Sequence, residues 1–414
     1  MIMHTTIFFL LITELIPNII GLGEFNDIDN NNEINSRIKR QMKRNISALW
    51  HSPINYNFER RIDAEWLRKI ILDIEFNTCI RFTKVQSLRE VSGMFFRYSG
   101  ICSSQVGRKV HHEWQDVFLG GRECSTKLLY VQQVLRTLGM YYEQNRYDRN
   151  SYVKVFFENI RPAFKDVFFM LPPKQLTTYG LPYDYGSIMH VDIYAHSRNN
   201  NFTIVPLDYL YAKTLGSSTS PTFIDYKLLN LHYCKRHCYN KLKCLNFGYP
   251  NFNSCVDCKC IKGFEGPRCE RYQKPLHPTC GGTLLKADNT LKKLKINGAK
   301  KCIYHILTKS SERIVFSIKA NMKPTLKHIC HSHNNLEVKY YKDKSVTGAR
   351  ICGTSHIENT MSKNNHIIIY YKSQDPWNKV SITYKAESKY SRRYKPVSCL
   401  LCMFNKRKYS QIEK

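Results

Sequence analysis

Three polar side chains share one face of a helix predicted in the first third of the chain. Gln132 and Arg136 are four residues apart, and Gln133 adjoins the first of them. Side chains at positions i and i+4 lie on the same helix face, so two such residues can reach one metal ion. Gly139 lets the chain turn, and Tyr142 follows where a third side chain can close the set. This is the spacing of a metal-dependent site, in which an acid beside the first ligand takes a proton from bound water.

The residue types at these positions are unsuited to that chemistry. The amide oxygen of Gln132 is a poor zinc ligand, and the amide of Gln133 has no basic site and cannot be a general base. Arg136 stays protonated and has no lone pair to donate, so it places a cation where the metal would lie. Two unit charges about 4 Å apart repel by about 4 kcal/mol at an effective dielectric constant of about 20, and a dication doubles that. Tyr142 alone is a weak ligand, so the four residues together predict that no catalytic zinc site forms.

The helix that carries these residues is predicted over residues 128–138 by apolar side chains at helical spacing. This stripe consists of Leu128, Val131, Leu135 and Leu138. A second helix, part of the core, is predicted over residues 62–74 by the stripe Ile62, Trp66, Ile70 and Ile74. The polar residues of the first helix therefore lie on the face opposite to its apolar stripe.

The segment after this helix, residues 139–153 with the sequence GMYYEQNRYDRNSYV, resembles the segment that follows the helical His-Glu-x-x-His-x-x-Gly motif of the astacin zinc peptidases. Residues 182–190, PYDYGSIMH, resemble the Met-turn of that family, in which a methionine, here Met189, packs beneath the metal site. The resemblance implies an α+β, metzincin-like domain with two lobes over residues 41–234.

Alignment on Gly139 places every zinc-binding and catalytic position of the family on a replaced residue. The zinc positions fall on Gln132, Arg136 and Tyr142, the auxiliary tyrosine ligand on Val191, and the catalytic glutamate on Gln133. The resemblance implies zinc as the cofactor only if the family activity is retained, and the residues themselves predict no cofactor. Because an unpaired buried cation is costly, we predict that the Arg136 guanidinium occupies the metal position, with the amide oxygens of Gln132 and Gln133, the Tyr142 hydroxyl and backbone carbonyls as acceptors.

Other histidines do not rebuild the site. His111 and His112 adjoin Glu113, but adjacent loop residues seldom form a metal site and a structural zinc needs four ligands, so we interpret them as a surface loop. His190 and His196 are interpreted as structural residues whose hydrogen bonds are satisfied within the fold.

Two cysteine-rich segments follow the peptidase-like region. Residues 235–270 combine six cysteines with the run Gly263-Phe-Glu-Gly266 and resemble an EGF-like module. Residues 280–385 alternate as strands between turns, which predicts a β-sandwich, and their cysteines resemble those of a CUB domain. Metal binding by the thiols of residues 235–270 is the alternative, and an oxidising compartment disfavours it. The resemblances imply the disulfides Cys79–Cys234, Cys102–Cys124, Cys238–Cys255, Cys244–Cys258, Cys260–Cys269, Cys280–Cys302 and Cys330–Cys352.

The two ends of the chain indicate secretion. The apolar run Ile7–Ile12 predicts a signal peptide over residues 1–23, and acidic, asparagine-rich residues 24–40 predict a pro-segment. No apolar run is long enough for a transmembrane helix, and sixteen cysteines suit an oxidising compartment, so we expect a secreted, extracellular protein. Residues 386–414 form a basic tail. The basic cluster Arg37–Arg40 is a predicted processing site, and Asn45 and Asn201 are predicted glycosylation sites. The pairing of Cys399 and Cys402 is left open.

The net charge of +30 indicates which classes of partner the protein can attract. A basic surface attracts polyanions such as acidic glycans or anionic membranes, and secretion argues against nucleic acid. A solvated basic surface without a dedicated partner is the alternative.

These observations predict a secreted, astacin-like protein that is catalytically inactive and acts by binding extracellular proteins or peptides. The alternative is a zinc metalloendopeptidase with unorthodox ligands that cleaves extracellular or cuticle proteins. A third possibility is a decaying gene whose product has no role.

Overall fold

The computed structural model describes residues 42–44, 48–86, 92–109, 114–122, 124–239, 242–323 and 328–390. All of these residues belong to one compact unit within Ile38–Lys414. Several predictions fall outside the described residues: the signal peptide, the pro-segment, the Asn45 sequon, the loop 111–113, and the tail cysteines Cys399 and Cys402.

The first lobe is built on a five-stranded sheet with the strand order β3-β2-β4-β6-β5. Its strands are β2 (Ile54–Phe58), β3 (Phe82–Lys84), β4 (Gly93–Tyr98), β5 (Ser103–Ser104) and β6 (Trp114–Leu119). Neighbouring strands are parallel except for β5, which pairs with β6 in the antiparallel direction.

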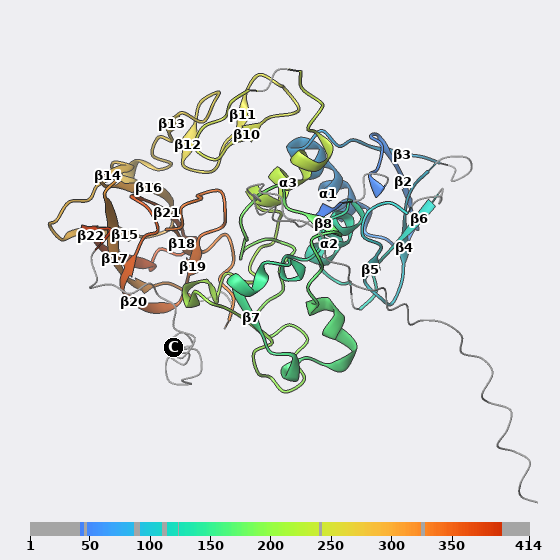
Figure 1. Cartoon of the computed structure of the whole chain (residues 1–414), viewed down its shortest axis with the longest axis horizontal. Coiled ribbons are helices and arrows are strands. Elements are labelled where there is room, and N and C mark those ends of the chain that lie inside the picture. Colours follow the sequence, from blue (N-terminus) through green and yellow to red (C-terminus); the bar gives the residue numbers. More distant parts are fainter. Residues whose placement is uncertain are drawn as a thin grey trace, which may run out of the picture. The chain divides into compact units, whose positions relative to one another are not determined.

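Two helices accompany this sheet, α1 (Ala64–Asn77) and α2 (Lys127–Thr137) (Figure 1). The α2 helix packs against β5 and β6, and α1 packs against α2. Each helix begins where a polar side chain accepts from a free backbone N–H: Asp63 accepts from Trp66 at 2.9 Å, and Thr126 accepts from Leu129 at 3.4 Å. Both helices that the apolar stripes predict are therefore present, with ends within two residues of the predicted ones, apart from the C-terminus of α1, which extends to Asn77.

The second lobe consists mostly of turns and short 3-10 helices. The 3-10 helices are Glu143–Asn145, Arg149–Ser151, Phe157–Asn159, Pro162–Phe168 and Tyr209–Tyr211. The paired strands are β1 (Met42–Lys43) with β8 (Leu176–Thr177), and β7 (Val153–Val155) with β9 (Ile204–Pro206). The helix α3 (Phe223–Tyr233) begins with a capping box between Thr222 and Asp225. The sequon residue Asn201 is exposed.

Residues 249–272 contain two small hairpins. Strand β10 (Tyr249–Pro250) pairs with β11 (Cys258–Lys259), and β12 (Phe264–Glu265) pairs with β13 (Arg271–Tyr272). The described residues contain seven disulfides, and these are the pairs that the resemblances imply.

A β-sandwich follows the 3-10 helix Pro278–Cys280 (Figure 1). One sheet has the order β14-β16-β21-β18-β19 and the other β15-β22-β17-β20. The first sheet contains β14 (Leu284–Lys286), β16 (Lys301–Leu307), β18 (Asn335–Lys339), β19 (Ala349–Ile351) and β21 (His366–Lys372). The second contains β15 (Lys292–Asn297), β17 (Glu312–Asn321), β20 (Thr354–Met361) and β22 (Lys379–Ser388). The predicted β-sandwich is thus confirmed, and the fold is α+β as predicted.

The core of the sandwich continues into the second lobe. One hydrophobic cluster contains Ile306, Ile318 and Ile382 of the sandwich together with Tyr185 and Tyr211 of the second lobe. The first lobe has a separate core that includes both predicted helices and Met189. The CUB-like sandwich is therefore joined to the second lobe by apolar packing as well as by polar contacts.

Candidate functional site

The helix α2 is buried on its polar face as well as on its apolar one. Gln133 is 3% exposed and Gln132 is 9% exposed, while Val131 and Leu135 are buried with the first-lobe core. Buried amides need hydrogen-bond partners, so both glutamines must be engaged within the protein.

Gln132 joins α2 to the predicted Met-turn. Its Nε2 donates to the carbonyl oxygen of Ile188 at 2.7 Å. Met189, the next residue, is fully buried, and its carbonyl oxygen accepts from the Glu143 N–H at 3.0 Å. The Gln132 side chain therefore cross-links the helix, the turn and the chain beyond Gly139.

Gln133 points to the edge of the sheet instead. Its Oε1 accepts from the Ser104 hydroxyl of β5 at 2.8 Å, and its carbonyl oxygen accepts from the Thr137 hydroxyl at 2.8 Å. An amide in this position fixes the helix to the strand and has no basic site for proton abstraction.

The Arg136 side chain lies over the ring of Tyr142. The guanidinium carbon is 4.8 Å from the ring centroid, which is a cation–π contact, and both residues are half-buried. The prediction that this cation lies beside Tyr142 agrees with the structure, but the predicted acceptors were wrong. No hydrogen bond joins the Arg136 guanidinium to Gln132 or Gln133 in the described part of the chain. The Gln133 Oε1 accepts from Ser104 instead, and the Gln132 Nε2 donates to Ile188.

We expect Arg136→His to lower the free energy of unfolding by about 1 kcal/mol, because the cation–π contact over Tyr142 is lost. Urea denaturation measures this change, with Arg68→His, an exposed site on α1, as the control at about 0.5 kcal/mol or less. Equal stability of the two variants would mean that the Arg136 contact contributes nothing.

The Met-turn is held by a buried carboxylate on α3. Asp225 accepts from the Ser187 hydroxyl at 2.6 Å and from the Ile188 N–H at 3.1 Å. Burial, reinforced by the nearby Asp184 charge, raises the pKa of Asp225 to about 6 against the effect of its hydrogen bonds. Val191 is half-buried and has no side-chain group that can bind a metal.

The two described histidines near the turn are structural, as predicted. His190 is buried, its Nε2 lies 2.6 Å from the Tyr183 hydroxyl and its Nδ1 lies 2.7 Å from the Val191 carbonyl oxygen. Burial lowers the pKa of His190 to about 4, so it is neutral at physiological pH. His196 stacks on Phe164 with ring centroids 4.2 Å apart.

A buried ion pair lies directly after Tyr142, at a residue that sequence reasoning did not single out. Glu143 accepts from Arg146 at 3.0 Å and from the Asp184 N–H at 2.8 Å, and both ionic side chains are fully buried. Burial raises the pKa of Glu143 to about 8, with the Arg146 charge acting against the rise. Arg146 also pairs with Asp148 at 2.9 Å, so this run is structural, as the resemblance implied.

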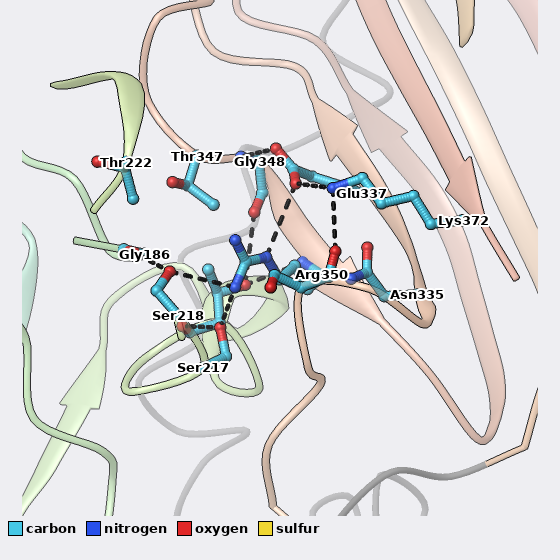
Figure 2. Close-up of polar contacts among 12 residues, drawn as sticks. Gly186, Ser217, Ser218, Thr222, Asn335, Glu337, Thr347, Gly348, Arg350 and Lys372 are labelled. Carbon is cyan, nitrogen blue, oxygen red and sulfur yellow. Dashed lines mark hydrogen bonds and ion pairs between the residues drawn. The ribbon is translucent and has the colours of Figure 1, made fainter. Parts of the chain in front are cut away.

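A loop of the sandwich contacts the Met-turn segment directly, as Figure 2 shows for Thr347 and Gly186. The Thr347 N–H donates to Asp184 Oδ1 at 2.9 Å, and its hydroxyl donates to Asp184 Oδ2 at 3.2 Å. A Cβ built on Gly186 would lie 2.5 Å from Thr347 Cγ2. Only a glycine fits at this approach, so the position of the loop depends on it.

The same interface contains a buried cluster of charges centred on Glu337 (Figure 2). Lys339 Nζ, Lys372 Nζ and Arg350 Nε each lie 3.7 Å from a Glu337 oxygen. The Gly348 N–H donates to Glu337 Oε1 at 3.0 Å. Burial favours the neutral acid, but the three cations outweigh it and lower the pKa of Glu337 to about 2.

Arg350 connects this cluster to the second lobe. Its Nη1 donates to the Ser217 hydroxyl at 2.6 Å, and its backbone N–H donates to the Thr214 hydroxyl at 2.9 Å. Ser218 in turn donates to the Gly186 carbonyl oxygen. Gly186 precedes Met189 in the chain, and Thr214, Ser217 and Ser218 lie between Met189 and α3. The sandwich therefore contacts the chain on both sides of Met189. Periodicity cannot reveal such contacts, and sequence reasoning missed them.

The residues at the predicted metal position do not fit zinc. Zinc needs three or four ligands with lone pairs aimed at one point. Gln132 instead presents its amide N–H to Ile188, Arg136 carries a fixed positive charge, and the Tyr142 ring faces that charge. Within the described residues, no group of three His, Cys, Asp or Glu side chains is placed to hold a metal ion.

Comparison with known proteins gives a consistent assignment of two regions. A family model for Astacin, which describes a family of peptidases, matches residues 42–234, and a model described as CUB domain matches residues 280–385. Zinc metalloproteinase nas-34 of Caenorhabditis elegans is 31% identical over 341 residues, covering 81% of this chain and 55% of that protein. Zinc metalloproteinase nas-23 of the same species is 30% identical over 332 residues, covering 77% of this chain and 61% of that protein. The chain thus spans less than two thirds of the length of either relative.

Among solved structures, high choriolytic enzyme 1, a hatching enzyme zinc-protease from Oryzias latipes, is 26% identical. The match covers 47% of this chain and 99% of that chain, with a TM-score of 0.42. Over the described part of the chain, no helix combines the length and the apolar character that crossing a lipid bilayer requires.

Proposed function

Because residues 42–234 form an astacin domain of the peptidase type and residues 280–385 form a CUB domain, we propose that this protein acts outside the cell by binding and does not hydrolyse peptide bonds. The astacin family is zinc-dependent, and both domains are typical of extracellular proteins. The proposed ligands are extracellular proteins or peptides, including substrates of active relatives and proteins of the matrix or cuticle.

The engagement of Gln132 and Arg136 carries this proposal. The Gln132 side chain is held by the bond from its N–H to Ile188 and offers only an amide oxygen, which is a poor zinc ligand, and Arg136 is cationic and has no lone pair to donate. Gln133, at the position of the catalytic glutamate, accepts from Ser104 and has no basic group. Gln132, Gln133 and Arg136 therefore make structural contacts within the protein in place of metal coordination. This favours a binding role over peptide hydrolysis.

The second candidate function is zinc-dependent peptide hydrolysis. The two relatives described above are zinc metalloproteinases, which favours it. So does the buried Met189, which lies in the same core as α2. On this view, the protein would need ligands other than those at the family positions.

We expect the purified mature protein to contain far less than one zinc per chain and to show no peptide hydrolysis. Elemental analysis after mild dialysis and a cleavage assay on a broad peptide library measure the two properties. The scaffold control is the variant Gln132→His, Gln133→Glu, Arg136→His and Tyr142→His, which restores the family residues and is expected to bind zinc. If the wild-type chain retains about one zinc, or shows hydrolysis that a chelator abolishes, then zinc-dependent peptide hydrolysis is the correct function.

A further inference from the structure

The outward face of the sheet β15-β22-β17-β20 is divided into a cationic half and a neutral half. Alternate side chains of these strands point into the sandwich core, among them Ile296, Ile382 and Ile318. Their neighbours in sequence therefore point outward. The cationic half is defined by four exposed residues, Lys293, Lys295, Lys319 and Lys379.

The strand register brings these lysines onto one surface. Lys295 pairs with Ser381, which pairs with Lys319 on the next strand. Strands lie about 4.8 Å apart, so the backbones of Lys295 and Lys319 are about 10 Å apart. Lys293 and Lys295 alternate on one strand at about 7 Å. Lys379 pairs with Asn297 on one side and with Asn321 on the other, at the same end of the sheet.

The charge of this half is not balanced by carboxylates. None of the four lysines forms an ion pair with a described residue, whereas the carboxylates of the face have partners of their own. Glu387 pairs with Lys385 at 2.7 Å in the other half, where it also lies opposite Arg313. Glu358 pairs with His356 at 3.2 Å. The cationic half is therefore available to an external polyanion.

Uncharged polar groups lie between the lysines, and one exposed aromatic ring lies close to Lys379 in sequence. Between the lysines stand groups that donate or accept hydrogen bonds, namely Asn297, Ser317, Asn321, Ser381 and Thr383. Trp377 is 79% exposed and lies two residues before Lys379. Its turn is fixed by Asp375, which accepts from the Trp377 N–H at 2.8 Å. An exposed, positioned indole offers a flat apolar ring on which a sugar ring can stack.

We infer that this surface binds a sulfated polysaccharide of the extracellular space. Cations spaced about 7 to 10 Å apart on a flat sheet suit sulfates distributed along an extended chain, and hydroxyl and amide groups between them suit sugar hydroxyls. A membrane surface is less well matched, because Trp377 is a single apolar side chain beside polar neighbours and binding to lipid requires a buried apolar face. The inference does not depend on whether the astacin domain hydrolyses peptides.

The test measures binding of the full-length protein to immobilised heparin at about 0.15 M salt, where exposed charges are screened beyond about 8 Å. The test variant is Lys293→Ser, Lys295→Ser, Lys319→Ser and Lys379→Ser. The matched control removes four exposed lysines outside the surface by Lys165→Ser, Lys174→Ser, Lys235→Ser and Lys309→Ser. Both variants have the same net charge and retain the basic tail, so a difference between them reports the surface itself.

We expect the test variant to bind heparin about tenfold more weakly than the wild type, and the control to change by about twofold or less. Trp377→Ala is expected to weaken binding about threefold without changing its salt dependence, because stacking involves no charge. Chemically desulfated heparin should bind weakly to all four proteins. Equal losses in test and control variants, unchanged binding of Trp377→Ala, or equally tight binding of anionic phospholipid vesicles would overturn the inference.

Discussion

Glu337→Gln is expected to lower the free energy of unfolding by about 3 to 5 kcal/mol, because it leaves two buried cations and one half-buried cation without their anion. The Lys339, Lys372 and Arg350 groups each lie 3.7 Å from the carboxylate, and Glu337 is 4% exposed. The glutamine keeps the size of the side chain and an acceptor for Gly348, so only the charge is removed. Chemical denaturation measures the loss, with Glu358→Gln as the exposed control at about 1 kcal/mol or less.

The same variant has a defined pH dependence. The folded-state pKa of Glu337 is about 2 and its ordinary value is 4.5, so its ionised form stabilises the fold at pH values above 4.5. That contribution is lost as the pH falls from 4.5 to about 2. We therefore expect the difference in stability between the wild type and Glu337→Gln to narrow over this window. A difference that stays constant down to about pH 2, or a loss below about 1 kcal/mol at neutral pH, would contradict an ionised Glu337.

Gly186→Ala is expected to lower the free energy of unfolding by about 1 to 3 kcal/mol, because the added methyl group has no space. It would lie 2.5 Å from Thr347 Cγ2 and 2.6 Å from Thr347 Cβ, well inside van der Waals contact. Relief requires the sandwich loop to move away from Asp184, which breaks the two hydrogen bonds from Thr347. Thermal or urea unfolding measures the effect, and Gly282→Ala, where no atom lies within 4 Å, is the control.

A double-mutant cycle separates this clash from a general effect of alanine. Thr347→Gly removes the atoms that the new methyl group meets, at the expense of the 3.2 Å hydroxyl contact with Asp184. We expect the double variant to be less destabilised than the sum of the single changes by about 1 kcal/mol or more. Additive losses, within about 0.5 kcal/mol, would show that residues 186 and 347 are not in contact.

The sequence predicted the parts of the fold that depend on local order. Apolar residues at helical spacing located α1 and α2, and alternating runs located β17, β18, β21 and β22. It also predicted that Arg136 would lie beside Tyr142, because a helix and a glycine turn fix their spacing. These features involve residues that are close in sequence.

The contacts that define the site depended on partners far along the chain. Ser104 reaches Gln133 across 29 residues, and Ile188 reaches Gln132 across 56. Thr347 reaches Asp184 across 163 residues. No periodic pattern encodes such pairs, so sequence reasoning gave Arg136 acceptors that the structure does not bring to it, one of which, Gln133, accepts from Ser104 instead. It also passed over Glu143, a single acid whose burial becomes evident only in three dimensions.

The close approach of Gly186 and Thr347 also limits which substitutions the protein can accept at these two positions during evolution. A larger residue at position 186 requires a smaller one at position 347, so the two positions can change only in a compatible order. Recombination that brought in a CUB segment from a relative would succeed only if its loop also accommodated this glycine. The astacin and CUB domains, although each has its own disulfides, are therefore coupled by this contact.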